Sequence, residues 1–261
     1  MPVLRVVCVA LLIGVTSAGS ACAGIRVEPP PPAVSRAPAP MGLCFGAGAV
    51  DTPLTAADGV PIAAARLGTG PRGIVLINEE DGNMCRWARY AAGWAAAGYH
   101  VLAFDLRCHG RSGCVGSRDY VADTSAAVAA LRAAGATRVV LVGASVGAAV
   151  AVVTAAHLPR LVHGVVSLSA RGLTTRVASA GHEPRTPLAA RSLLRVPLLF
   201  MYAEHDRLAM PAREAAEFVN EVPSPDKRLV VFPGTVHGTH MLLTGGEVPV
   251  HVDAFLTDVL P

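Results

Sequence analysis

A single serine stands between two glycines where one apolar stretch gives way to another. Residues 138–157 read RVVLVGASVGAAVAVVTAAH, in which Gly143, Ser145 and Gly147 fit the pattern G-x-S-x-G. The residues before Ser145 are typical of a buried strand and those after it of a buried helix. A tight strand-to-helix turn needs small neighbours and exposes the hydroxyl, and the helix N-terminus favours negative charge. The pattern predicts Ser145 as a nucleophile; a purely structural turn is the alternative.

A serine hydroxyl is a weak nucleophile unless a base takes its proton and a carboxylate orients that base. Asp206 follows the apolar stretch VPLLFMYA and His237 follows RLVVFPG, so both fall in loops after predicted strands. The order Ser, Asp, His is the one that a nucleophile on such a turn uses. We therefore predict His237 as general base and Asp206 as orienting acid. Their rivals in the same loops are His240 and Glu204.

Strand and helix patterns alternate from about residue 43 to the end of the chain. The expected strands are PIAAARLG, GIVLINEE, HVLAFDLR, RVVLVGA, GVVSLS, VPLLFMYA and RLVVFPG, with helical patterns between most of them. This alternation predicts an α/β fold with a mostly parallel, doubly wound sheet and helices on both faces. Ligands bind at the carboxyl ends of such strands, where the serine, acid and histidine loops would meet.

Length, composition and charge limit the class of protein. The chain has 261 residues, 52% of them hydrophobic and 16% charged, which is enough for one α/β domain with a full core. The net charge of +3 is scattered without a basic stripe, which argues against nucleic-acid binding. The sequence has no C-x-x-C pair and no histidine cluster, so we expect neither a metal nor another cofactor.

Four stretches together resemble the α/β-hydrolase superfamily. Besides the serine turn, AFDLRCHGRSG at residues 103–113 is similar to the DxRGHGxS loop of the family, with Cys108 in place of its usual glycine. YAEHDRL is similar to the acid loop and FPGTVHG to the histidine loop. The resemblance extends from about residue 53 to the end. It implies an α/β-hydrolase fold with Ser145 as nucleophile, His237 as base and Asp206 as acid.

An acyl-transfer site also needs two backbone N–H groups that bind the oxyanion. Val146, directly after the nucleophile, is the first expected donor. The second should lie in the turn after GIVLIN, where many relatives have His-Gly and this chain has Glu79 and Glu80. This turn resembles the dienelactone-hydrolase branch, in which a glutamate follows the strand. We favour the N–H of Glu80 over that of Glu79, and expect solvated side chains as the alternative role of both residues.

The segment that could form a cap over the site is short. Only residues 170–195 lie between GVVSLS and the acid strand, and they include few large apolar residues, so we expect a minimal cap and no lipase-type lid. The expected activity is that of a serine hydrolase cleaving small-molecule carboxylic esters through an acyl-enzyme. The alternatives are a thioesterase, peptidase or acyltransferase on the same fold, or a non-catalytic binding protein. The sequence leaves the oligomeric state open.

Residues 1–23 have the layout of a secretory signal peptide, with Arg5 before a short apolar run and small residues after it. GSAC resembles a lipoprotein lipobox, which places cleavage before Cys22 and a lipid anchor on that cysteine. Cleavage at an A-x-A site over residues 21–23 is the alternative and would give a secreted soluble protein. Residues 24–42 are proline-rich and predict an extended linker, followed by the hydrolase domain at residues 43–261. We expect an extracytoplasmic lipoprotein of the cell membrane.

Four cysteines remain after the predicted signal peptide: Cys44, Cys85, Cys108 and Cys114. An even number in an exported domain favours two disulfides, for which three pairings are possible. Cys108 and Cys114 bracket one loop, so we pair them with each other and Cys44 with Cys85. Four free thiols are the alternative.

Overall fold

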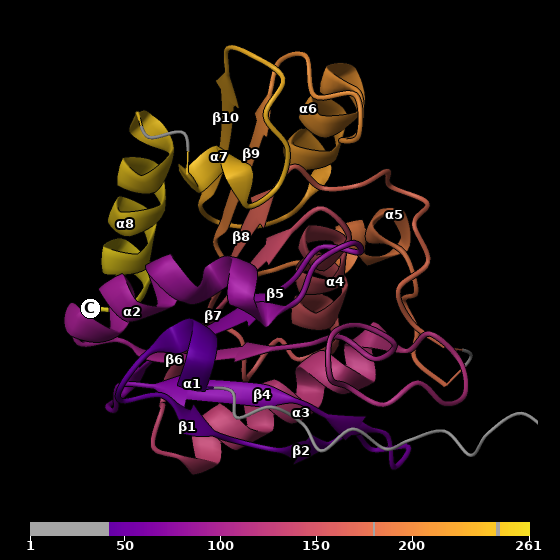
Figure 1. Cartoon of the computed structure of the whole chain (residues 1–261). Helices are drawn as coiled ribbons and strands as arrows, with labels where there is room; N and C mark the ends of the chain where they lie inside the picture. Colours follow the sequence, from indigo (N-terminus) through magenta and orange to yellow (C-terminus); the bar gives the residue numbers. More distant parts are fainter. Residues whose placement is uncertain (1–41, 180, 244–245) are drawn as a thin grey trace, which may run out of the picture. The chain divides into compact units, whose positions relative to one another are not determined.

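The computed structural model describes residues 42–179, 181–243 and 246–261 (Figure 1). The predicted signal peptide, Cys22 and the linker up to residue 41 lie outside the described residues. In the described part, an eight-stranded sheet has the order β1-β4-β6-β5-β7-β8-β9-β10. β4 runs antiparallel to both of its neighbours, whereas every pair from β6 to β10 is parallel. This arrangement confirms the predicted mostly parallel sheet.

The expected strands form where apolar residues are continuous, and each is short. A small antiparallel pair, β2 with β3, lies outside the main sheet. The strands are β1 (Val50–Asp51), β2 (Leu54–Thr55), β3 (Pro61–Ile62), β4 (Ala64–Leu67), β5 (Arg72–Ile77), β6 (His100–Phe104), β7 (Arg138–Ala144), β8 (Gly164–Leu168), β9 (Leu198–Ala203) and β10 (Lys227–Phe232).

Helices cover both faces of the sheet, as the alternating pattern predicts (Figure 1). Two short 3₁₀ helices, η1 and η2, accompany them in the described residues. The helical elements are α1 (Gly42–Phe45), η1 (Met84–Trp87), α2 (Ala88–Ala96), α3 (Tyr120–Ala133), α4 (Val146–His157), α5 (Pro187–Ala190), η2 (Arg191–Leu193), α6 (Ala212–Glu221), α7 (His240–Leu243) and α8 (Glu247–Val259).

The sheet separates two apolar cores because successive side chains of a strand point to opposite faces. On β5, Val75 and Ile77 join the core that includes α3, α4, α5 and α6. Ile74 and Leu76 join the other core, which includes α1, α2, α7 and α8. Both faces of the central strands are therefore buried, which explains why these strands are continuously apolar in sequence.

One predicted strand is divided in the structure. The sequence predicts a single strand over residues 61–68, but Ile62 pairs with Leu54 in the small sheet and Ala64 pairs with Phe104 in the main sheet. The chain changes sheets at Ala63. The N–H of Ala63 donates to Ser112 Oγ at 2.9 Å and its carbonyl accepts the N–H of Asp105 at 2.9 Å. Both backbone groups of Ala63 therefore bind the loop after β6 instead of a partner strand.

Candidate active site

Ser145 alone forms the turn between β7 and α4. Its backbone has φ 54° and ψ −115°, a left-handed conformation that costs free energy for a residue with a side chain. A Cβ atom on Gly143 would lie 2.1 Å from the carbonyl oxygen of Gly147, and one on Gly147 would lie 2.4 Å from the carbonyl oxygen of Ile77. Both positions therefore require glycine, which is the physical basis of the G-x-S-x-G pattern.

Hydrogen bonds fix the backbone of Ser145 against the sheet. Its N–H donates to the carbonyl of Leu168 on β8 at 2.9 Å, and the residue is 7% exposed. Val146 is the first residue of α4, so its N–H has no acceptor within the helix. The serine hydroxyl consequently stands beside the positive end of a helix dipole.

The acid and histidine loops meet after β9 and β10. Nδ1 of His237 lies 2.7 Å from Oδ2 and 3.0 Å from Oδ1 of Asp206. A carboxylate accepts hydrogen bonds, so Nδ1 carries the proton and Nε2 remains as the basic nitrogen. Oδ1 of Asp206 also accepts the N–H groups of Leu208 at 3.0 Å and Ala209 at 3.2 Å. These contacts hold the carboxylate group in place, and the Asp206 side chain is only 1% exposed.

The two rival residues, Glu204 and His240, make other contacts. The side chain of Glu204 is 60% exposed, and its carboxylate lies 3.9 Å from Nε2 of His205. His240 begins α7 on the rim of the cavity, and its N–H donates to the carbonyl of His237. The structure thus brings Asp206 to His237 and leaves Glu204 outside this contact.

Ser145 and His237 line one cavity of about 310 Å³ at the carboxyl ends of the parallel strands. Most of the other side chains around it carry charge. Among the described residues that line it, Leu208 is the only one with an aliphatic side chain. The cavity residues are Glu79, Glu80, Asp81, Arg86, Ser145, Arg171, Leu208, His237 and His240.

The turn after β5 adjoins the nucleophile because Gly147 packs against the carbonyls of Ile77 and Asn78. Asn78 is fully buried and organises the turn. Its Nδ2 donates to the carbonyls of Glu79 at 2.8 Å and Gly82 at 3.1 Å, and its Oδ1 accepts the N–H of Leu106 at 3.1 Å. Asn78 is not among the residues predicted from the sequence, where an amide directly after an apolar strand was the available signal.

The side chains of Glu79 and Glu80 are paired rather than merely solvated. Oε1 of the buried Glu79 accepts the N–H of Thr239 at 2.8 Å and also its hydroxyl, which ties the turn to the histidine loop. Glu80 forms ion pairs with Arg118 at 2.9 Å and with Arg171. These contacts were not predicted from the sequence.

The loop after β6 is held by a buried acid and a disulfide. Asp105 accepts the N–H groups of Met84 at 2.7 Å and Arg111 at 2.8 Å, and burial raises the pKa of its carboxyl group. Cys108 is bonded to Cys114 and has φ 64°, the left-handed conformation that glycine adopts easily. Cys44 is bonded to Cys85 and joins α1 to η1. Both disulfides have the pairing expected from the sequence.

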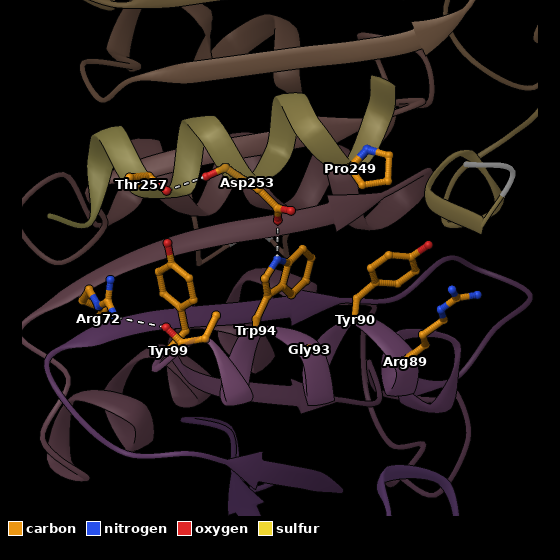
Figure 2. Close-up of a pocket in the computed structure, with 10 residues that line it drawn as sticks. Arg72, Arg89, Tyr90, Gly93, Trp94, Tyr99, Pro249, Asp253 and Thr257 are labelled. Carbon is orange, nitrogen blue, oxygen red and sulfur yellow. Dashed lines mark hydrogen bonds between the residues drawn. The ribbon is translucent and has the colours of Figure 1, made fainter. Parts of the chain in front are cut away.

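A larger cavity of about 560 Å³ lies between α2 and α8 (Figure 2). Tyr90, Trp94 and Tyr99 line it, and Trp94 Nε1 donates across it to Asp253 Oδ1 at 2.8 Å. The guanidinium of Arg72 lies 4.6 Å from the Tyr99 ring centroid. Neither Ser145 nor His237 lines this cavity, so the candidate nucleophile and base belong to the smaller one.

Across residues 42–261 apart from the three undescribed positions, no group of three histidine, cysteine, aspartate or glutamate residues could hold a metal ion. In the same described segments, no helix is long and apolar enough to cross a membrane.

Comparison with known proteins shows the family and the fold. The family model described as serine aminopeptidase S33 matches residues 71–181 and 185–241. An esterase from Pyrococcus furiosus is 21% identical, covers 88% of this chain and 98% of its own, and has a TM-score of 0.70. No curated protein matches the chain.

Two further solved structures have the same fold. A putative dienelactone hydrolase from Klebsiella pneumoniae is 18% identical over 72% of this chain and 87% of its own, with a TM-score of 0.56. A structure from work on carboxylesterases of Nitrososphaera gargenis is 16% identical over 80% and 98%, with a TM-score of 0.63. At these identities, the likeness shows the fold alone.

Proposed function

Because this chain belongs to the serine aminopeptidase S33 family of α/β-hydrolases, we propose that it is a serine hydrolase that cleaves carboxylic esters. The observation that carries the proposal is the arrangement of three side chains. Ser145, on its left-handed turn, shares a cavity with His237, and the buried carboxylate of Asp206 holds the far side of the imidazole. This arrangement supports nucleophilic catalysis by an activated serine.

The reaction proceeds through two transfers of the acyl group. Nε2 of His237 accepts the hydroxyl proton as Oγ of Ser145 attacks the ester carbonyl, and then gives that proton to the leaving alcohol. In the second half, His237 takes a proton from water, the hydroxide attacks the acyl-serine, and the proton returns to Ser145 as the carboxylic acid leaves. The N–H groups of Val146 and Glu80 stabilise the oxyanion of each tetrahedral intermediate.

Asp206 acts on the imidazole rather than on the substrate. Its carboxylate keeps the proton on Nδ1, which leaves Nε2 basic, and it stabilises the imidazolium that forms during each transfer. The backbone donors of Leu208 and Ala209 hold the carboxylate in place. Asp206 is therefore proposed as the orienting acid of a Ser145–His237–Asp206 triad.

The cavity favours short, polar substrates. Its volume of about 310 Å³ and its mostly charged lining offer little apolar surface to a long acyl chain. Among the described residues of the insert after β8, the regular structure is limited to the short helices α5 and η2, which do not form a large cap. Glu79 and Glu80 are already paired with other side chains, and the amino group of a peptide would have to displace those partners. These features favour short-chain esters over peptides.

A substrate panel tests this proposal. The purified protein should hydrolyse p-nitrophenyl acetate and butyrate with a kcat/KM at least about tenfold above that for the laurate ester, for thioesters and for aminoacyl p-nitroanilides. Faster turnover of the aminoacyl anilides would support a peptidase instead. No turnover of any substrate, together with no reaction of Ser145 with a phosphonate, would support a non-catalytic binding protein.

We also propose that the mature protein is an extracytoplasmic lipoprotein anchored through Cys22. The two disulfides support an oxidising environment outside the cytoplasm. A diacylglyceryl group with an amide-linked chain would give stable attachment, whereas one acyl chain is marginal. Cys22→Ala should move the protein from the membrane fraction to the soluble fraction. A soluble wild-type protein that begins at Gly24 would favour secretion instead.

A further inference from the structure

Glu80 connects two arginines across the rim of the active-site cavity. Its Oε1 accepts a hydrogen bond from Nη1 of Arg118 at 2.9 Å, and its Oε2 pairs with Nη1 of Arg171. Glu80 lies in the turn after β5, Arg118 lies just before α3, and Arg171 lies in the insert after β8. We call these three residues the rim bridge. It joins segments that are 38 and 91 residues apart in sequence.

Arg171 belongs to the framework of the nucleophile. Its backbone N–H donates to the carbonyl of Ser145 at 3.3 Å. The preceding carbonyl, that of Ala170, accepts the N–H of Met210 in the acid loop at 2.9 Å. The side chain of Arg171 then extends from this fixed backbone along the cavity to Glu80. The ion pair therefore ties the turn after β5 to the backbone that carries Ser145.

Arg118 provides a second fixed point. The next residue, Asp119, is the N-cap of α3 and accepts the N–H of Ala122 at 3.1 Å. Asp119 also accepts hydrogen bonds from Ser179 and His182, each at 2.7 Å. Hydrogen bonds hold the backbone of Arg171 itself and the residue next to Arg118. The two guanidinium groups therefore hold the carboxylate of Glu80 from two directions.

We infer that Glu80 is a positioning residue, whose side chain holds the turn so that its own N–H is placed to bind the oxyanion. The inference rests on the proposed function. A single exposed ion pair contributes little, but one carboxylate shared by two anchored arginines forms a network. The oxyanion exists only in the transition state and the intermediates, so a displaced donor weakens stabilisation of the transition state and leaves binding of the neutral ester unchanged.

This role makes a specific kinetic prediction. Glu80→Gln keeps the shape and the backbone N–H but removes the charge, and it should lower kcat about tenfold while KM stays within about twofold of wild type. Its melting temperature should change by no more than about 2 °C, because the bridge is largely exposed. Arg171→Lys, which keeps the charge, should retain more of kcat than Arg171→Gln.

Two controls separate positioning from general effects. Glu217→Gln removes another exposed ion pair, with Arg213 on α6, and should leave kcat unchanged. Raising NaCl from about 0.05 M to about 1 M should lower kcat of the wild type through screening, and the effect should be much smaller in Glu80→Gln. If Glu80→Gln does not fold, the inference is tested by the salt dependence of wild-type kcat and by comparing kcat of Arg171→Lys with that of Arg171→Gln.

The inference is overturned if Glu80→Gln has wild-type kcat, if it changes KM alone, or if its salt response equals that of the wild type. Failure of the proposed function has a different signature. In that case Ser145→Ala would retain ester turnover, or Ser145 would not react with a phosphonate, whatever the Glu80 variants do. A Ser145-dependent esterase that is insensitive to Glu80→Gln would reject the positioning role alone.

Discussion

Nδ1 of His237 lies 2.7 Å from Oδ2 of Asp206, and the side chain of His237 is 17% exposed whereas that of Asp206 is 1% exposed. The acid is thus shielded from water and the histidine retains one accessible edge. This asymmetry suits a base that must meet substrate and an acid that only orients it.

Asp206→Asn should lower kcat by about 10³- to 10⁴-fold, because an amide does not hold the imidazole in the correct tautomer or stabilise its charged form. The matched control is Glu204→Gln, which changes an exposed carboxylate two residues earlier and should retain wild-type kcat. Steady-state hydrolysis of p-nitrophenyl acetate measures both. A large loss in Glu204→Gln with none in Asp206→Asn would reject Asp206 as the acid.

Gly147→Ala should greatly reduce both activity and the yield of folded protein, because its Cβ would lie 2.4 Å from the carbonyl oxygen of Ile77, a backbone atom. The control is Gly93→Ala on α2, where nothing lies within 4 Å of the added Cβ. That variant should match or exceed wild-type stability by up to about 1 kcal/mol, because alanine favours helix. Thermal melts compare the two; equal melting temperatures would contradict this packing.

Loss of the Cys44–Cys85 disulfide should destabilise the protein more than loss of Cys108–Cys114. The bridges close segments with sequence separations of 41 and 6 residues. In the loop-entropy account, such separations correspond to about 4 and about 2 kcal/mol. Urea unfolding of the two double-serine variants measures the order, and the reverse order would contradict it.

Position 108 offers a second test, because its φ of 64° is easy for glycine and costly for other residues. Once the disulfide is removed, Cys108→Gly with Cys114→Ser should be more stable than Cys108→Ser with Cys114→Ser by about 1 kcal/mol. The comparison uses urea unfolding under identical conditions. A more stable serine variant would show that the left-handed turn does not persist without the disulfide.

Asp119 should make stability depend on pH in the acid range. Burial alone would raise the pKa of its carboxyl group, but hydrogen bonds from Ser179, Ala122 and His182 outweigh it and hold the pKa below its ordinary value. A lowered folded-state pKa adds stability above the ordinary value of about 4, and this stability is lost as pH falls through the folded pKa.

Asp119→Asn keeps a side chain that can cap α3 but loses the charge. It should therefore melt below wild type at neutral pH, and the gap should close towards about pH 2. Melting temperatures across this range measure the gap. A constant gap would mean that the charge of Asp119 contributes nothing.

The parts of the site that follow from local pattern were predictable from the sequence. The turn at Ser145 is encoded by two glycines, and the loops with Asp206 and His237 follow apolar strands whose carboxyl ends share one edge of the sheet. The disulfide pairing of Cys108 with Cys114 followed from their position around one loop.

Contacts between distant segments could not be predicted in this way. Glu79 meets Thr239 across 160 residues of sequence and Glu80 meets Arg171 across 91, and no periodic pattern relates such pairs. The division of residues 61–67 into β3 and β4 also depends on a distant residue, Ser112, which takes the N–H of Ala63. Elements of two to four residues, such as α1, β1, β2 and α7, are too short for periodicity to reveal.

Reaction of Ser145 with a fluorophosphonate is the most direct test of the central claim that this serine is an activated nucleophile. The wild-type protein should gain one phosphonyl group, located by peptide mapping on Ser145, and lose its ester turnover in proportion. Ser145→Ala should remain unlabelled and lose at least about 10⁴-fold in kcat, and His237→Ala should lose about as much because the two act as a unit. An unmodified Ser145 in folded protein, or ester turnover that survives Ser145→Ala, would contradict the account.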